Sequence, residues 1–103
     1  MQRSLCVSSD VSDAELDAVF AALADPTRRS LLARLLRDGA RSATDLAHDL
    51  PMSRQAVVHH LQVLDGAGLV DGRRSGREVR WSATTAVLAD AAAWMTAVAA
   101  GGG

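Results

Sequence analysis

Apolar residues in the N-terminal half of the chain recur every three to four positions, the spacing that buries one face of a helix. Residues 12–24 and 25–39 both follow this pattern. Ser12 can cap the first helix within a Ser-x-x-Glu capping box, and Asp25 can cap the second. Pro26 fits the first turn of the second helix because it loses no hydrogen bond there. The pattern therefore predicts two consecutive helices, the first ending near residue 24 and the second stopped at residue 39.

Two shorter helices are expected next. The apolar spacing and the caps Ser42 and Ser53 favour helices over residues 42–50 and 54–66. Between them lies a three-residue turn, Pro51-Met52-Ser53. Two helices joined in this way form a helix-turn-helix pattern.

The apolar period changes in VDGRRSGREVRW, residues 70–81. Ser75-Gly76 suits a two-residue hairpin turn, which places Val70, Val79 and Trp81 on one face. The same register pairs two arginines across the tip, and this pair is unfavourable unless an anion lies between them. The predicted pairs are Arg74 with Arg77, Arg73 with Glu78, Gly72 with Val79, Asp71 with Arg80, and Val70 with Trp81.

A last helix is expected from a cap at Thr84 or Thr85 to about Ala100, and it is apolar nearly all round. Its large apolar residues cannot all face one small core, so a two-fold partner is the simplest cover. These residues are Val87, Leu88, Ala91, Trp94, Met95 and Val98.

Length and composition favour one small domain in a chain of 103 residues, with 49% apolar residues. We expect a flexible tail over residues 1–11, one domain over 12–100 and a flexible end over 101–103. The sequence has no apolar run long enough to cross a membrane, and its start lacks a signal-peptide pattern. A single cysteine, Cys6, cannot form an internal disulfide, so a cytoplasmic location fits best.

The net charge is only −1, but the charges are unevenly distributed. Residues 27–80 carry ten arginines against six acidic residues, whereas residues 1–26 carry one arginine against five acidic residues. The middle of the chain is therefore the part expected to bind a polyanion.

The helix over residues 54–66 divides into two faces at 100° per residue. His60 falls within the inward arc, where a packed histidine with a satisfied ring nitrogen is favoured over a metal ligand. Arg54 lies in the first turn, where phosphates bind well. The outward face suits base edges, since glutamine can pair with adenine and a small apolar side chain can contact a thymine methyl group. A plain solvated face is the alternative, although such faces usually carry Glu and Lys. Inward lie Ala56, Val57, His60, Leu61, Val63 and Leu64, and outward lie Gln55, Val58, His59 and Gln62.

Three segments together resemble the ArsR/SmtB family of winged-helix bacterial transcription regulators: LADPTRRSLLARLLRDG, SATDLAHDLPMSRQAVVHHLQVLDGAGLV and GRRSGREVRW. The resemblance covers about residues 16–98. It implies a mainly α winged helix-turn-helix of about five helices with a two-stranded wing. It also implies a homodimer joined through the first and last helices, which represses transcription from an inverted-repeat DNA operator until an inducer releases it.

The resemblance also implies site residues. Many members carry serine where this chain has Val58, so one hydrogen bond available to them is missing here. The implied DNA contacts of the recognition helix are Ser53, Arg54, Gln55, Val58, His59 and Gln62, and those of the wing are Arg73, Arg74 and Arg77. The expected dimer interface comprises Leu16, Val19, Phe20, Leu88, Ala91, Trp94, Met95 and Val98.

Metal or redox sensing is not expected. Metal-sensing relatives carry a Cys-x-Cys pair where this chain has Ser42 and Thr44, or Asp and His ligands in a last helix where it has only Asp90. Redox-sensing relatives need two cysteines. We therefore expect no metal and no cofactor. The inducer is then an unknown small molecule, or the protein has none and simply regulates its own operon.

An enzyme is not expected either, because no nucleophile–base set or glycine-rich phosphate loop is present. Asp45 and Asp49 fit solvated or capping roles better than catalytic ones. The alternative from another class is a winged-helix protein-interaction module that does not bind DNA. Arg74 and Arg77 argue against it, because such a module has little need for arginines at the tip of a wing.

Overall fold

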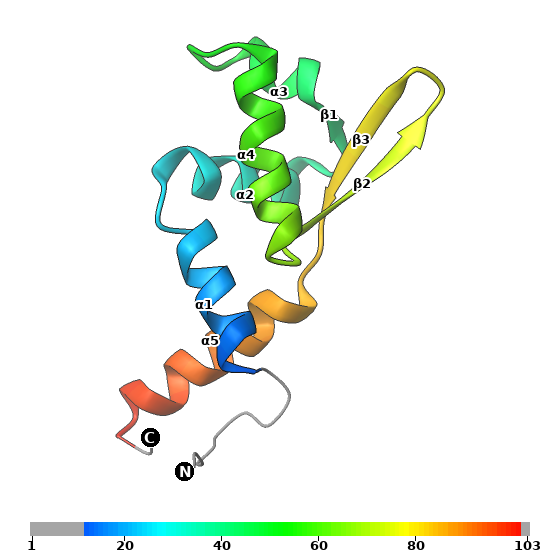
Figure 1. Ribbon diagram of the computed structural model, residues 1–103. Coiled ribbons are helices and arrows are strands. Elements are labelled where there is room, and N and C mark those ends of the chain that lie inside the picture. Colours follow the sequence, from blue (N-terminus) through cyan, green and yellow to red (C-terminus); the bar gives the residue numbers. More distant parts are fainter. Residues whose placement is uncertain (1–11, 102–103) are drawn as a thin grey trace.

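The computed structural model describes residues 12–101 and shows five helices with a small antiparallel sheet (Figure 1). The predicted fold class is confirmed for this part of the chain. The expected tail over residues 1–11, with Cys6, and the last two glycines lie outside the described residues. None of the helices in the described part is long and apolar enough to span a bilayer.

The first two helices begin where their caps predict. Helix α1 (Asp13–Ala22) follows a complete capping box, in which Ser12 and Glu15 each accept the other's backbone amide hydrogen. Helix α2 (Pro26–Asp38) follows Asp25, whose carboxylate accepts the amide of Arg28 at 3.0 Å. Helix α1 ends two residues before the expected position. Asp25 is extended, as the residue before a proline prefers, so the chain must leave the helix earlier.

The helix-turn-helix consists of α3 (Ala43–His48) and α4 (Arg54–Gly66). The caps Ser42 and Ser53 are confirmed, because their hydroxyl groups accept the amides of Asp45 and Ala56 at 3.1 Å. The expected end of α3 at residue 50 is wrong, and the connection to α4 spans residues 49–53. Pro51 disfavours the helical conformation in the residue before it, which shortens α3.

The wing belongs to a three-stranded sheet rather than to an isolated hairpin. Strands β2 (Val70–Ser75) and β3 (Glu78–Ala83) form the hairpin, and β1 (Arg41–Ser42) pairs with the other edge of β3. The sequence pattern did not predict β1, because two residues carry no detectable period.

The predicted register of the hairpin is wrong by two residues. The turn is Gly76-Arg77, so Ser75 pairs with Glu78 and Gly72 pairs with Trp81. Gly76 has φ +65°, and positive φ at the first central position is what a type II′ turn requires. A shift of two residues keeps Val70, Val79 and Trp81 on one face, but it removes the predicted opposite-charge pairs and the Arg74–Arg77 pair.

Helix α5 (Ala86–Ala99) lies beside α1 at the end of the molecule away from the wing (Figure 1). Its N-cap is Thr85, but without a side-chain hydrogen bond. Thr84 instead donates its hydroxyl to the carbonyl oxygen of Gly68 at 2.6 Å, which ties the entry of α5 to the end of α4. The core holds these helices and the base of the wing together; its fully buried large side chains are Val19, Leu31, Leu46, Val57, Leu61, Leu64 and Leu69.

Candidate nucleic-acid interface

Helix α4 is fixed to the core along one face and open to solvent along the other. Val57 and Leu61 are fully buried, whereas Gln55, His59 and Gln62 are exposed. The predicted division of this helix is therefore confirmed for these residues. Amide and imidazole groups on a rigid helix can donate and accept hydrogen bonds at defined positions, which base recognition requires.

Val58 is the exception on the outward face. The structure places it half-buried and packed against the core. It lies 100° from Val57 around the helix, at the edge of the apolar arc. Val58 was expected on the outward face with Gln55, His59 and Gln62, and the structure leaves only part of its side chain accessible.

The N-terminus of α4 is open to solvent. Ser53 and Arg54 are both exposed, and the Ser53 hydroxyl already accepts the amide of Ala56. The remaining free amides of the first turn and the guanidinium of Arg54 leave positive charge at this end of the helix. This charge favours a phosphate next to the exposed glutamines.

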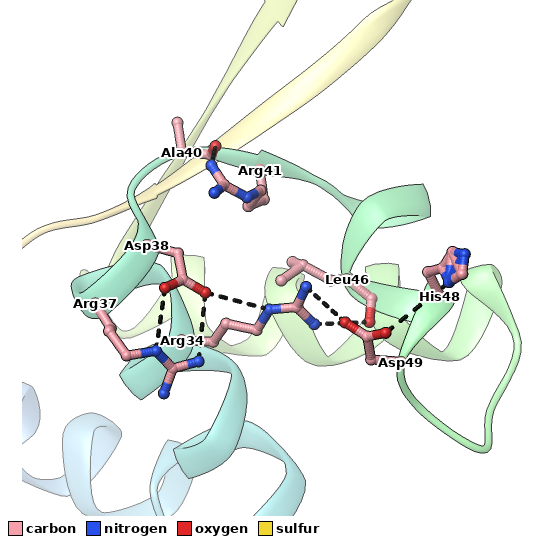
Figure 2. A network of polar contacts seen from close by, with 8 residues as sticks. All are labelled: Arg34, Arg37, Asp38, Ala40, Arg41, Leu46, His48 and Asp49. Atoms are coloured by element: carbon pink, nitrogen blue, oxygen red, sulfur yellow. Dashed lines mark hydrogen bonds and ion pairs between the residues drawn. The ribbon is translucent and has the colours of Figure 1, made fainter.

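Arg34 of α2 contacts the C-terminal end of α3 (Figure 2). Its guanidinium contacts the Asp49 carboxylate at 2.9 Å and Asp38 at 3.6 Å, and it donates to the Leu46 carbonyl oxygen at 3.5 Å. A cation at the C-terminus of a helix is stabilising, because the last carbonyl groups there have no partner within the helix. Arg34 thereby fixes the end of α3 and the start of the turn that leads into α4.

Asp38 is held by two arginines in the same network. Arg37 donates to both of its oxygens, at 3.1 and 3.3 Å. This hydrogen bonding, with a weaker effect of the neighbouring arginine charges, lowers the pKa of Asp38 below its ordinary value. The carboxylate therefore stays ionised and balances part of the positive charge of α2.

The three arginines predicted for the wing differ in their partners. Arg73 donates to Asp71 at 2.8 Å, an interaction that raises the pKa of Arg73. Arg74 and Arg77 are exposed, and within residues 12–101 no acidic side chain lies within 4 Å of either guanidinium. Arg74 faces Val79 across the hairpin and Arg77 occupies the turn. Two of the three wing arginines are thus free to contact an anion.

The base of the wing is also held by an arginine. Arg80 donates to the Ala40 carbonyl oxygen at 3.0 Å, and Arg41 donates to the same oxygen at 2.8 Å. Trp81 lies directly over Gly72 on the other face of the hairpin. These contacts fix the base of the wing, whereas its tip is solvated.

His60 packs inward, as its place on the helix predicts. It is half-buried, and its Nδ1 atom lies 3.4 Å from the guanidinium of Arg28 on α2. The prediction of a packed histidine with a partner for its ring is confirmed. Its partner lies 32 residues away along the chain, so Arg28 was not among the predicted site residues.

The structure separates the eight residues expected at a dimer interface into two groups. Leu16, Val19 and Ala91 lie in the core of the single chain, so they cannot face a partner in this conformation. The others reach the surface at least partly, with Phe20 and Trp94 in contact at 5.9 Å between ring centroids. The accessible group comprises Phe20, Leu88, Trp94, Met95 and Val98.

Metal-binding geometry is absent from residues 12–101, which hold no cluster of three or more His, Cys, Asp or Glu side chains. Ser42 is buried and serves as the cap of α3, while Thr44 is exposed. Neither side chain supplies a thiolate at the start of α3.

Comparisons with known proteins agree with this geometry. A family model described as a helix-turn-helix domain matches residues 23–73. The transcriptional repressor SdpR of Bacillus subtilis is 38% identical over 80 residues, which cover 78% of this chain and 88% of SdpR. The regulator CmtR of Mycobacterium tuberculosis is 38% identical over 85 residues, which cover 82% of this chain and 71% of CmtR.

Solved structures give the same result. An ArsR-like transcriptional regulator from Rhodococcus sp. RHA1 superposes with a TM-score of 0.74 at 45% identity, covering 84% of this chain and 81% of that one. The structure of an ArsR family transcriptional regulator, RHA00566, superposes with a TM-score of 0.76 at 29% identity, covering 84% and 88% of the two chains.

Proposed function

This chain belongs to the ArsR/SmtB family of DNA-binding transcriptional regulators, and from that premise we propose that it is a repressor that binds an inverted-repeat operator as a homodimer. Helix α4 would contact base edges in the major groove, and the β2–β3 wing would contact phosphates. The two activities use different residues and are separable by mutation.

The observation that carries the proposal is the outward face of α4. Gln55, His59 and Gln62 are exposed together, and the fully buried Val57, Leu61 and Leu64 anchor the opposite face of the helix, which fixes their orientation. Glutamine can pair bidentately with adenine, and each such pair contributes about 1–3 kcal/mol of discrimination between bases. Ser53 and Arg54, which are exposed at the start of the helix, would hold the adjacent phosphate.

The wing supports the proposal from a second direction. Arg74 and Arg77 are exposed at and beside the turn, whereas Arg73 is engaged by Asp71. Guanidinium groups without an acidic partner bind phosphate independently of base sequence. We therefore assign the stronger phosphate contacts to Arg74 and Arg77 and a weaker one to Arg73.

A homodimer is supported by the apolar stripe of α5. Ala91 is fully buried, but Met95 and Val98, within about 40° of it around the helix, are 45% and 43% exposed. The cover that the single chain provides thus ends midway along the helix, beside the exposed ring of Phe20. A second copy related by a two-fold axis would cover this surface and place two α4 helices about 34 Å apart, one turn of DNA.

We further propose that no metal ion controls this repressor, and that it is released by an organic small molecule or acts without an inducer. The start of α3 offers a capping serine and a threonine where metal-sensing relatives carry thiolates. Adding stoichiometric zinc, cadmium or arsenite should leave operator affinity unchanged. A loss that a chelator reverses would contradict this part of the proposal.

The proposal is tested by titrating labelled duplexes with the protein and following fluorescence anisotropy at several salt concentrations. The duplexes come from two sources. One is the DNA upstream of the protein's own coding sequence, and the other is the set of sequences that the protein enriches from a randomised library. The tightest of them, called here the operator duplex, is compared with a scrambled duplex of the same composition. We expect a preference of about a thousandfold or more that weakens steeply with salt. A folded dimer that binds neither duplex would contradict the proposal and favour a protein-interaction module.

A further inference from the structure

One arginine, Arg28 of α2, contacts two other helices, α1 and α4. It lies in the first turn of α2, and its Nε and Nη2 atoms donate to the carbonyl oxygens of Ala22 and Ala21 at 2.6 and 3.3 Å. These carbonyls belong to the last turn of α1, and that of Ala21 also accepts the amide of Ala24 at 3.2 Å. Nη1 of the same guanidinium lies 3.4 Å from Nδ1 of His60 on α4. A single half-buried side chain therefore connects the end of α1 to the recognition helix.

The contact with His60 requires an unprotonated Nδ1. Guanidinium has five N–H donors and no acceptor, so the ring nitrogen that faces it must offer a lone pair. A neutral imidazole with its proton on Nε2 meets this condition. An imidazolium ion cannot meet it, because both of its nitrogens are donors and its charge repels the guanidinium at this distance.

We propose that Arg28 is a positioning residue for DNA recognition, which holds α4 in the orientation for base contacts through neutral His60. This inference rests on the proposed function, since it concerns how the same DNA-binding surface is set. His60 precedes Leu61, a fully buried anchor of α4, and follows His59 on the exposed face. A change at His60 therefore acts directly on the segment of α4 that carries the base contacts.

The proposal gives DNA recognition a dependence on pH with a defined sign. The contact exists only while the His60 ring is neutral, so it is lost when the pH is low enough to protonate the ring. Besides Arg28, the groups near His60 are Asp25 at the N-cap of α2 and His59 on α4 itself. Protonation of exposed His59 would strengthen binding to any DNA. The readout is therefore the ratio of operator to scrambled affinity, and each protein is also measured with His59→Gln, because His59 is itself a proposed base contact.

Two substitutions of His60 separate positioning from packing. His60→Gln keeps a neutral acceptor for Arg28 at every pH, and His60→Phe keeps an aromatic ring without any acceptor. The ratio of operator to scrambled affinity is measured by anisotropy titration from pH 5.5 to 8 for both variants and for wild type. His48→Gln is the matched control, because His48 is 80% exposed on α3 and does not contact Arg28. Thermal unfolding of each variant at each pH confirms that the compared proteins are folded.

We expect the wild-type and His48→Gln ratios to fall by roughly a hundredfold or more from pH 8 to 5.5, as expected for the loss of a hydrogen bond to a charged group in each of two subunits. The ratio of His60→Gln should stay near the wild-type value at pH 8 throughout. The ratio of His60→Phe should be low at every pH. The proposal would be overturned if His60→Gln kept the pH dependence of the wild type. It would also be overturned if folded His60→Phe had the same ratio as the wild type at pH 8. If His60→Phe does not fold, the comparison of His60→Gln with wild type still decides.

A double-mutant cycle tests the link to Arg28 itself. Arg28→Gln removes the guanidinium but keeps the backbone amide that Asp25 accepts. If the two side chains act as one unit, Arg28→Gln with His60→Phe should lower the ratio no further than either single substitution. Additive losses would overturn the proposal. Failure of wild type to prefer the operator duplex at pH 8 would instead contradict the proposed function.

Discussion

Replacing both Arg74 and Arg77 with alanine tests whether the tip of the wing binds phosphate. Both side chains are exposed and, in the described part of the chain, without an acidic neighbour within 4 Å. Each phosphate contact contributes about 0.9 to the slope of log affinity against log salt. A dimer that loses four contacts should therefore show a slope smaller by about 3 to 4. Between about 50 and 200 mM salt, the variant should lose roughly a hundredfold less affinity than wild type.

The assay is the anisotropy titration with the operator and scrambled duplexes over that salt range. The variant should weaken binding to both duplexes by a similar factor, because phosphates carry no base identity. Arg37→Ala serves as the control, since Arg37 is 68% exposed on α2 and pairs with Asp38 outside the proposed interface. An unchanged slope in the double variant would refute the assignment of the wing. A loss confined to the operator duplex would mean that the wing contacts bases instead.

Three further predictions concern the other surfaces and the stability of the fold. Met95→Glu would bury a charge in the proposed dimer interface and should raise the dimer dissociation constant by about a hundredfold or more, as measured by sedimentation velocity. Ala93→Glu, on the opposite side of α5, should leave the protein dimeric, and a dimeric Met95→Glu would place the interface elsewhere. Gln55→Ala should cost about 1–3 kcal/mol of discrimination at one base pair of each half-site, whereas an equal loss on scrambled DNA would exclude a base contact. The amide of Arg28 holds the pKa of Asp25 below its ordinary value of 3.8, so the folded state binds fewer protons and this stabilisation is lost as the pH falls through that region. Asp25→Asn, which can still cap α2, should therefore make the free energy of unfolding in urea less dependent on pH below about pH 4, and an unchanged dependence would contradict the assignment.

The helices were predictable because their signals are local. Ser12, Asp25 and Ser53 each cap the helix that follows them, and each cap needs only the next three residues. Strand β1 was not predictable in the same way. It consists of Arg41 and Ser42, and it exists because β3, some 40 residues later, offers a free edge. Nothing within two residues signals such a distant partner.

The exposed face of α4 could also be predicted, because the spacing of its apolar residues is a local signal. Contacts with other helices and strands could not be predicted from that spacing. The spacing of Val57 and Leu61 determines which side of α4 is buried, and it left Gln55 and Gln62 outside. The burial of Val58 depends on core residues from other elements. The contact between Arg28 and His60 joins two helices that are distant in the chain, so a helical wheel gives the inward direction of His60 but not its partner.

The wing shows why an apolar pattern can give the correct faces together with the wrong partners. Side chains alternate with a period of two, so any shift by two residues leaves Val79 and Trp81 on the buried face. The register is determined by two glycines instead. Gly76 supplies the positive φ at the first central position of the turn, and Gly72 leaves room for the ring of Trp81, which would lie 2.9 Å from a Cβ atom there. Pairing the largest side chain of the hairpin with the residue that has none would have selected the observed register, in which Arg74 and Arg77 no longer face each other.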